Sequence, residues 1–184
     1  MPSEIAFPIE TPRLLIRPMQ LGDAEDLHEV YADVETMQHL ETDLPRTVEE
    51  SREWVKTKMD LHEKDGLSLW AVVERRSGRV IGDCGLQWED IGTGRQEVCL
   101  GGRGNRAFWR QGYGIEAALA CMRAGFERLE LERISASTAP DNVPARRLLD
   151  RIGMVEEGST GEGWPVYFAY RETWRPPEPT DLRP

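Results

Sequence analysis

The sequence FWRQGYGIEAALACMRAGFERLELERISASTAPDNVPARRLLDRIGM, residues 108–154, decides the fold of this chain. It combines a glycine turn that opens a helix, a following strand, and a second helix that begins at Asp141-Asn142. A helix N-terminus presents unpaired backbone N–H groups and the positive end of the helix dipole, which together favour phosphate. Gly112 and Gly114 leave the backbone without side chains where a ligand would approach it. The stretch therefore predicts a site for a phosphate-bearing cofactor, although a tight strand-to-helix connection needs the same turn.

The glycine turn matches neither of two simple nucleotide-binding motifs. The chain has no G-x-x-x-x-G-K-[ST] sequence, and the turn GYGIEA at 112–117 lacks the third glycine of the dinucleotide fingerprint. The identity of the cofactor therefore depends on the rest of the chain.

Hydrophobic spacing along the chain predicts a mixed α/β fold. Alternating apolar residues indicate strands, and apolar residues three or four positions apart indicate helices. The expected strands lie at 11–19, 67–75, 79–88, 97–102, 133–138 and 166–174. The expected helices begin at Gly22-Asp23, at the capping-box sequence that starts with Thr47, near Gln111, and at Asn142. This order gives antiparallel strands early and a β-α-β crossover late, so the glycine turn would face a gap between diverging strands.

Length and composition indicate one globular domain with an acidic surface. The chain has 184 residues, of which 39% are hydrophobic and 30% charged, and its formal net charge is −10. This acidity argues against non-specific binding to nucleic acid, which needs a basic surface. It would suit a cationic substrate such as an amine, or it serves only to keep the protein in solution.

Nothing in the sequence indicates a membrane or an oxidising compartment. No stretch approaches the roughly eighteen consecutive apolar residues that a spanning helix needs. The N-terminal MPSEIAFPIE lacks the basic-then-apolar layout of a secretory signal. The three cysteines, Cys84, Cys99 and Cys121, have neither metal-ligand nor disulfide-framework spacing. We therefore expect a cytoplasmic protein that binds neither a membrane nor a metal.

Further motifs accompany the glycine turn. The turn stands within WRQGYGIEA (109–117), and PDNVPARRLLDRIGM (140–154) follows it. Upstream, TPRLLIRP, WAVVER and RVIGDCGL lie in the expected early strands. Together these segments resemble the GNAT superfamily of N-acetyltransferases, in particular its RimJ/RimL-like branch, whose turn commonly reads W-G-K-G-Y-A-x-E-A. The resemblance covers about residues 10–175, nearly the whole chain.

The resemblance implies the GNAT acyl-CoA N-acyltransferase fold. In that fold a central, mostly antiparallel sheet splays at the cofactor site and is flanked by about four helices. It implies one N-acetyltransferase domain at residues 11–175, after an N-terminal extension at 1–10. The proline-rich residues 176–184 are expected to be disordered.

The resemblance further implies that acetyl-CoA is the acetyl donor and that the glycine turn binds its pyrophosphate. Helix-terminus physics would assign this role to backbone N–H groups of the segment from Arg110 to Gly114. The segment consists of Arg110, Gln111, Gly112, Tyr113 and Gly114.

Other residues would hold the rest of the donor. The splayed strand end at Arg103, Gly104 and Asn105 would bind the pantetheine arm and polarise the thioester carbonyl. Asn142 would bind the pantetheine arm, cap its helix, or do both. Arg146 would reach the phosphates or remain solvated, and the same alternatives hold for Arg103, Arg110 and Arg147.

Catalysis in the family is a direct attack of an amine on the acetyl group while both substrates are bound. An ammonium has no free electron pair, so a base must first remove its proton. Glu97 is the candidate base because its strand would line the acetyl site, where it shares a face with Cys99. The alternatives are that Glu97 is an exposed strand carboxylate, or that Glu162 in a glycine-rich loop is the base.

The candidate acid departs from the family pattern. The usual positions, three and seven residues after the asparagine, hold Ala145 and Leu149, and neither side chain can donate a proton. Tyr167 is the candidate in their place, with Tyr170 as a second choice. Cys99 is a weaker candidate for an acyl-carrying nucleophile, because no histidine lies near it in the sequence.

The sequence thus predicts an N-acetyltransferase that moves acetyl from acetyl-CoA to a primary amine, either a protein N-terminus or a small molecule. The missing acid keeps a second interpretation open, a non-catalytic module that binds or senses acyl-CoA. The sequence identifies neither the amine acceptor nor the oligomeric state, and a homodimer is compatible with it.

Overall fold

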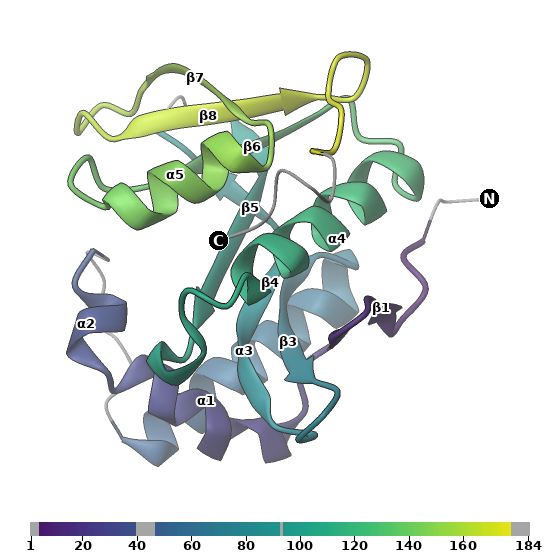
Figure 1. Ribbon diagram of the computed structural model, residues 1–184, viewed down its shortest axis with the longest axis vertical. Helices are drawn as coiled ribbons and strands as arrows, with labels where there is room; N and C mark the ends of the chain where they lie inside the picture. The colour runs from purple at the N-terminus through teal and green to yellow at the C-terminus, as the bar shows by residue number, and fades with distance from the viewer. Residues whose placement is uncertain (1–3, 40–46, 93, 178–184) are drawn as a thin grey trace.

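One mixed sheet of eight strands forms the centre of the computed structural model, which describes residues 4–39, 47–92 and 94–177. The strands lie in the order β1-β2-β3-β4-β5-β6-β8-β7 (Figure 1). Neighbouring strands are antiparallel except β5 and β6, which are parallel. The strands are β1 Ile9–Glu10, β2 Leu14–Arg17, β3 Ser68–Glu74, β4 Val80–Asp90, β5 Gln96–Gly104, β6 Arg133–Ser137, β7 Val155–Ser159 and β8 Pro165–Tyr170. This sheet confirms the predicted mixed α/β fold.

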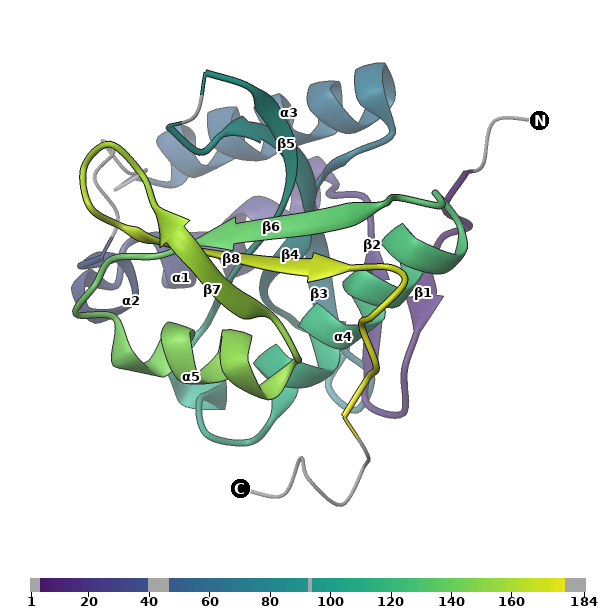
Figure 2. The same ribbon diagram turned by 90° about the horizontal axis from the view of Figure 1, so that it is seen from above.

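Helices cover both faces of the sheet. They are α1 Ala24–Tyr31, α2 Val34–Met37, α3 Val48–Asp65, α4 Tyr113–Glu127 and α5 Val143–Arg151, with short 3-10 helices η1 Leu21–Asp23 and η2 Arg106–Phe108. α1 and α3 pack on one face, and α4 and α5 pack on the other (Figures 1 and 2). None of the helices in the described part of the chain combines the length and apolarity that crossing a bilayer requires.

The long helix α3 begins and ends at signals that the sequence carries. The Thr47 hydroxyl accepts a hydrogen bond from the Glu50 N–H at 3.1 Å, and the Glu50 carboxylate accepts one from the Thr47 N–H at 2.8 Å. This is the predicted capping box. Gly66 ends the helix in the left-handed conformation, with φ 68°. These two ends place α3 over the sheet, where it later contributes to the candidate site.

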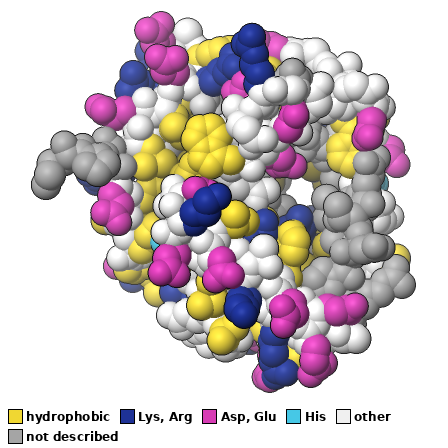
Figure 3. Space-filling view, turned by 180° about the vertical axis from the view of Figure 1, so that it is seen from behind, with side chains coloured by type: hydrophobic (Ala, Val, Ile, Leu, Met, Phe, Trp, Pro, Cys, Tyr) yellow, Lys and Arg dark blue, Asp and Glu magenta, His cyan; other side chains and the backbone are white. Residues whose placement is uncertain are grey.

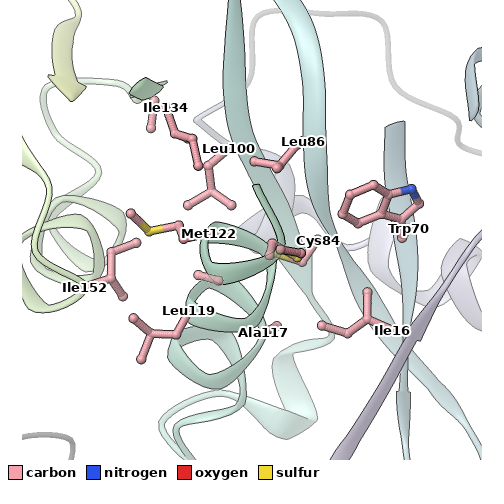
Figure 4. Close-up of a cluster of buried hydrophobic side chains, with 14 of the residues drawn as sticks. Ile16, Trp70, Cys84, Leu86, Leu100, Ala117, Leu119, Met122, Ile134 and Ile152 are labelled. Atoms are coloured by element: carbon pink, nitrogen blue, oxygen red, sulfur yellow. The ribbon is translucent and has the colours of Figure 1, made fainter. Parts of the chain in front are cut away.

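Alternating side chains give the sheet a separate layer on each face. In β4, Cys84 and Leu86 point to the layer beneath α4, whereas Asp83 and Gln87 contact side chains from α1 and α3. Figure 4 shows the α4 layer, whose labelled side chains are Ile16, Trp70, Cys84, Leu86, Leu100, Ala117, Leu119, Met122, Ile134 and Ile152. Burial of such large apolar side chains contributes roughly 1.5–3 kcal/mol each.

The sequence pattern does not predict β1, α2 or β7. β1 is a two-residue edge strand that pairs with β2. It lies within residues 1–10, the segment expected to be an N-terminal extension of the domain. All five residues of β7 are exposed, so this strand has no alternation of apolar and polar residues. The last strand ends at Tyr170, and residues 178–184 of the predicted tail lie outside the described residues.

The strands β5 and β6 diverge from one another. Their ladder in the described chain consists of one register pair, Cys99↔Ser135, whereas β5 pairs with β4 from Gln96 to Gly104. Beyond this pair, the β6-facing edge of β5 therefore lacks a continued strand partner. An unpaired strand edge offers backbone donors and acceptors to a ligand.

Candidate active site

The loop between β5 and α4 adopts a backbone conformation that only a few residue types tolerate. Arg110 has φ 59° and Gly112 has φ 80°, both in the left-handed region. The Trp109 indole N–H donates to the Gly104 carbonyl at 2.7 Å, and the Gln111 side-chain amide donates to the Ala107 carbonyl at 3.0 Å. The loop is thus held against the end of β5 by its own side chains.

The first turn of α4 presents free donors. A helix leaves its first N–H groups without partners inside the helix. In the described part of the chain, the N–H groups of Tyr113, Gly114 and Ile115 also have no acceptor outside it, and no side chain caps the helix. α4 is 15 residues long, so its N-terminus carries the full partial charge of a helix dipole. This arrangement suits an anion such as phosphate.

Arg13, which directly precedes β2, braces this turn from a distant part of the chain. Its Nε lies 2.6 Å from Glu116 Oε2, and its Nη1 donates to the Gln111 carbonyl at 2.7 Å. Its guanidinium carbon lies 4.3 Å from the centre of the Tyr113 ring. The Thr11 hydroxyl donates to the other Glu116 oxygen at 2.7 Å. Arg13 thereby offsets the one carboxylate in the first turn of α4, which would otherwise repel a phosphate.

Replacement of Arg13 by glutamine is expected to weaken coenzyme A binding about tenfold, because Glu116 then loses its counter-charge beside the free N–H groups. The Arg13 side chain is 44% exposed, so its loss should change the free energy of unfolding by about 1 kcal/mol or less. Calorimetric titration with coenzyme A measures the first effect and urea unfolding the second. The matched control is Arg75→Gln, since Arg75 is 45% exposed and also bonds this segment, at the Thr11 carbonyl. Equal weakening of coenzyme A binding in both variants would show that the effect comes from the change in net charge and not from the contact with Glu116.

The residues predicted to bind the donor at the end of β5 have partners within the protein. The Arg103 N–H donates to Asp83 Oδ1 at 2.9 Å, and Arg103 Nη1 lies 3.3 Å from Asp83 Oδ2. Asn105 caps η2 by accepting the Ala107 N–H at 3.0 Å, and its side-chain amide donates to Glu29 at 3.0 Å. Arg103 therefore points toward α1 and α3, and its role toward a donor stays a prediction.

Asn142 and Arg146 lie in the first turn of α5. Asn142 Oδ1 accepts the Ala145 N–H at 3.2 Å, which confirms the capping role. Its amide N–H groups have no partner among the described residues, so they are free to meet a ligand. Arg146 donates to the Tyr167 hydroxyl at 3.1 Å and lies 3.1 Å from Glu156. Its Nη1 also donates to the Pro140 carbonyl at 3.2 Å, so Arg146 would have to leave these three partners to reach a phosphate.

The candidate base and acid, Glu97 and Tyr167, lie on opposite faces of the sheet. Glu97 shares the α3 face with Cys99, and both its carboxylate oxygens contact the Arg133 guanidinium, one of them at 3.0 Å from Nε. Tyr167 packs into the α4 layer with 1% exposure, and its hydroxyl donates to Glu156 at 3.1 Å. The structure does not bring these two side chains together.

The other side chains considered for chemistry are less suited to it. Cys99 is buried, its Sγ lies 3.0 Å from Ser135 Oγ, and burial raises the pKa of its thiol to about 12. A thiol that stays protonated at neutral pH is a poor nucleophile. Leu149 fills the α4 layer, and Glu162 is exposed in the connection between β7 and β8. Among the described residues no group of His, Cys, Asp and Glu side chains is arranged to hold a metal ion.

A polar cluster on the α1 and α3 face is largely missed by the sequence analysis, which singles out only Arg103 among its members. It consists of Tyr31, Trp54, Lys58, Asp83 and Arg103, from α1, α3, β4 and β5. The Tyr31 hydroxyl donates to Asp83, whose side chain is completely buried. Asp83 alone could have indicated the cluster, because it is a carboxylate inside the apolar strand segment RVIGDCGL. A buried carboxylate needs partners from other elements.

Comparison with known proteins places the chain in a family. The family model for the acetyltransferase (GNAT) domain matches residues 13–155. The uncharacterized N-acetyltransferase p20 of Bacillus licheniformis is 30% identical over 148 residues, covering 80% of this chain and 82% of p20.

Solved structures show the same architecture. The crystal structure of a GNAT-family acetyltransferase from Bacillus anthracis aligns with a TM-score of 0.75 at 27% identity, covering 89% of this chain and 98% of that one. Mycobacterium smegmatis RimJ, in complex with CoA-disulfide, shares the fold with a TM-score of 0.71 at 16% identity, covering 90% of this chain and 84% of RimJ. Because the family match spans most of the chain, from the residue before β2 to the start of β7, this protein belongs to the GNAT family of acetyltransferases.

Proposed function

We propose that this acetyltransferase moves acetyl from acetyl-CoA to a primary amine, either a protein N-terminus or a small molecule, as a member of the RimJ/RimL-like branch. The observation that carries the proposal is the free first turn of α4 beside the open edge of β5. The helix start suits the pyrophosphate of the donor, and the strand edge suits the amides of its pantetheine arm.

The residues around these two features fit such a donor. A Cβ on Gly112 would lie 3.3 Å from Arg13 Nη2, so a side chain there would press on the guanidinium that braces the turn. The unpaired amide N–H groups of Asn142 lie at the start of α5 and would serve the pantetheine arm. Binding of CoA-disulfide by M. smegmatis RimJ, which has the same fold, supports the choice of ligand class.

In the proposed reaction the amine nitrogen attacks the acetyl carbonyl carbon, the carbon–sulfur bond breaks, and an amide forms. The ammonium must first lose a proton, and Glu97 is our candidate for the base because it lies two residues before the Cys99↔Ser135 pair where β5 and β6 meet. Its carboxylate would have to release Arg133 or act through a water molecule. Coenzyme A leaves as a thiolate, which Tyr167 would protonate only after releasing Glu156. Thiolates are stable enough near neutral pH to leave without a dedicated acid.

The direct test of this function is a thiol-release assay with acetyl-CoA and a panel of amines that includes peptides with free N-termini. We expect release that depends on the amine, and acetylation of that amine by mass spectrometry. Tight coenzyme A binding without turnover of any amine would instead support a module that only binds acyl-CoA. Absence of coenzyme A binding would contradict the proposal.

The base assignment is tested by comparing Glu97→Gln with Arg133→Gln. If Glu97 is the base, Glu97→Gln should lower kcat about 100-fold and remove the acidic limb of the pH–rate profile. Arg133→Gln removes the partner of Glu97 but keeps the carboxylate, so this variant should retain that limb. If neither variant changes the shape of the pH–rate profile, Glu97 is not the base, and its ion pair with Arg133 only joins β5 to β6.

A further inference from the structure

The polar cluster defined above lies beside the divergence of β5 and β6. In the β4–β5 register Asp83 pairs with Arg103, and Gln87 pairs with Cys99, the residue at which β5 meets β6. The proposed donor site is at the start of α4, a helix of the opposite face, so the α1 and α3 side of the divergence is left for the acceptor. This face is hollowed in the space-filling view, with Lys or Arg side chains at the rim of the hollow (Figure 3).

The cluster contains two cations and one carboxylate. Arg103 pairs with Asp83, with Nη1 and Oδ2 3.3 Å apart. Lys58 Nζ has no carboxylate within ion-pair distance among the described residues, and it contacts Gln87 Oε1 at 3.0 Å and the Trp54 ring at 4.3 Å from its centre. Lys58 is only 6% exposed. A buried ammonium without an ion-pair partner is energetically costly, so this one lacks a partner that the described residues do not supply.

Two further donors of the cluster are unpaired. Arg103 Nε and Trp54 Nε1 are buried and have no hydrogen-bond partner within the part of the chain that the structure describes. They are close together, because the Arg103 guanidinium carbon lies 5.6 Å from the centre of the Trp54 ring. Buried polar groups in folded proteins are nearly always satisfied, so two unpaired donors beside a cation without an ion-pair partner indicate an acceptor that the described residues do not provide.

Burial itself opposes the charge on Lys58. Desolvation lowers the pKa of its ammonium, while Asp83 and the exposed Glu89 act in the opposite direction and Arg103 adds to the lowering. An anion placed between Lys58 and Arg103 would favour the charged form. The chain as a whole carries a net charge of −10, so such an anion would bind through this local pairing and not through long-range attraction.

We propose that Lys58, Arg103 and Trp54 bind an anionic group of the acceptor, so that the acceptor is an amine that also carries a carboxylate or a phosphate. This inference rests on the proposed acetyl transfer and names the class of its acceptor. The anion accepts hydrogen bonds from the Arg103 and Trp54 donors and completes the charge balance of the cluster. The amine of the same molecule then lies toward the divergence of β5 and β6.

The test replaces Lys58 by methionine, which keeps the length of the side chain and removes its charge. Wild-type protein should acetylate an amino acid at least about 10-fold more efficiently, as kcat/KM, than the amide of the same amino acid. Lys58→Met should raise KM for the acid by about 10-fold or more and leave both KM for the amide and coenzyme A binding unchanged. Its thermal stability should be equal or higher, because a buried ammonium is removed. The control is Lys56→Met, an exposed lysine on the same helix.

The outcomes separate this inference from the proposed function. Equal kcat/KM values for the acid and the amide would overturn the inference, and so would equal effects of Lys58→Met and Lys56→Met on KM. Either result would leave the proposed acetyl transfer intact. A matched pair of amines with and without a phosphate distinguishes phosphate from carboxylate. If no amine is turned over, calorimetry with coenzyme A present measures binding of the acid and the amide. Binding of the acid that Lys58→Met abolishes supports the inference even then, and equal or absent binding overturns it.

Discussion

Gly112→Leu is expected to weaken coenzyme A binding about 100-fold or more, because the new side chain covers N–H groups whose bonds to a phosphate are charge-assisted. The backbone at this position has φ 80°, and an added Cβ would lie 3.3 Å from Arg13 Nη2. The side chain therefore has to displace the Arg13 guanidinium or project over the first turn of α4. Isothermal titration with coenzyme A measures the loss directly.

The fold should survive this change, and a second glycine provides the control. Gly78, in the connection between β3 and β4, has φ 72° with no atom within 4 Å of an added Cβ. At either position the fold requires a left-handed backbone conformation, which is unfavourable for leucine. Each substitution should therefore lower the free energy of unfolding by about 1–2 kcal/mol. Only the variant at Gly112 should lose coenzyme A. An equal loss of affinity in Gly78→Leu would refute the assignment of the glycine turn to the pyrophosphate.

Asp83→Asn should give the largest loss of stability, about 3–5 kcal/mol, because it removes the only carboxylate among the five residues of the polar cluster. The carboxylate is completely buried and contacts Arg103 and Tyr31. An amide of the same shape accepts fewer hydrogen bonds, leaves Arg103 without its ion-pair partner, and removes the longer-range attraction that Asp83 exerts on Lys58. Urea unfolding of the variant and the wild type measures the difference.

The electrostatic origin of this loss can be separated from a packing effect with a double-mutant cycle. In a Lys58→Met background the cluster holds one cation fewer, so Asp83→Asn should cost about 1–2 kcal/mol less than it does alone. Strictly additive losses would mean that the charge of Lys58 plays no part.

Features that depend on neighbouring residues were predictable from the sequence. The capping box at Thr47 and Glu50 and the cap at Asn142 form within one turn, so the residue types specify the geometry directly. The two-residue period of a strand likewise places Glu97 on the face of Cys99. The glycine turn was predictable for the same reason, since Gly112 takes a backbone conformation that glycine tolerates best.

Features that depend on distant partners were not predictable. Periodicity tells which face a side chain occupies but not what it meets there, so Arg133 beside Glu97 could not be anticipated. Lys58 lies on a helix whose other residues are mostly polar, and nothing local distinguishes it from its exposed neighbour Lys56. The strand β7 was missed because every residue in it is exposed and the usual alternation is absent.

The hydrogen bond from Arg13 to the Gln111 carbonyl joins residues 98 positions apart in the chain. The proposed anion-binding turn is therefore complete only when the N-terminal strands have docked, so its affinity for a ligand would be linked to the local stability of that edge of the sheet. By the same linkage, a ligand held at the start of α4 stabilises β2, a strand that supplies none of the free N–H groups. Local unfolding of the first strands would thus release the ligand. Binding of the acetyl donor would in turn stabilise the N-terminal edge of the sheet against this unfolding.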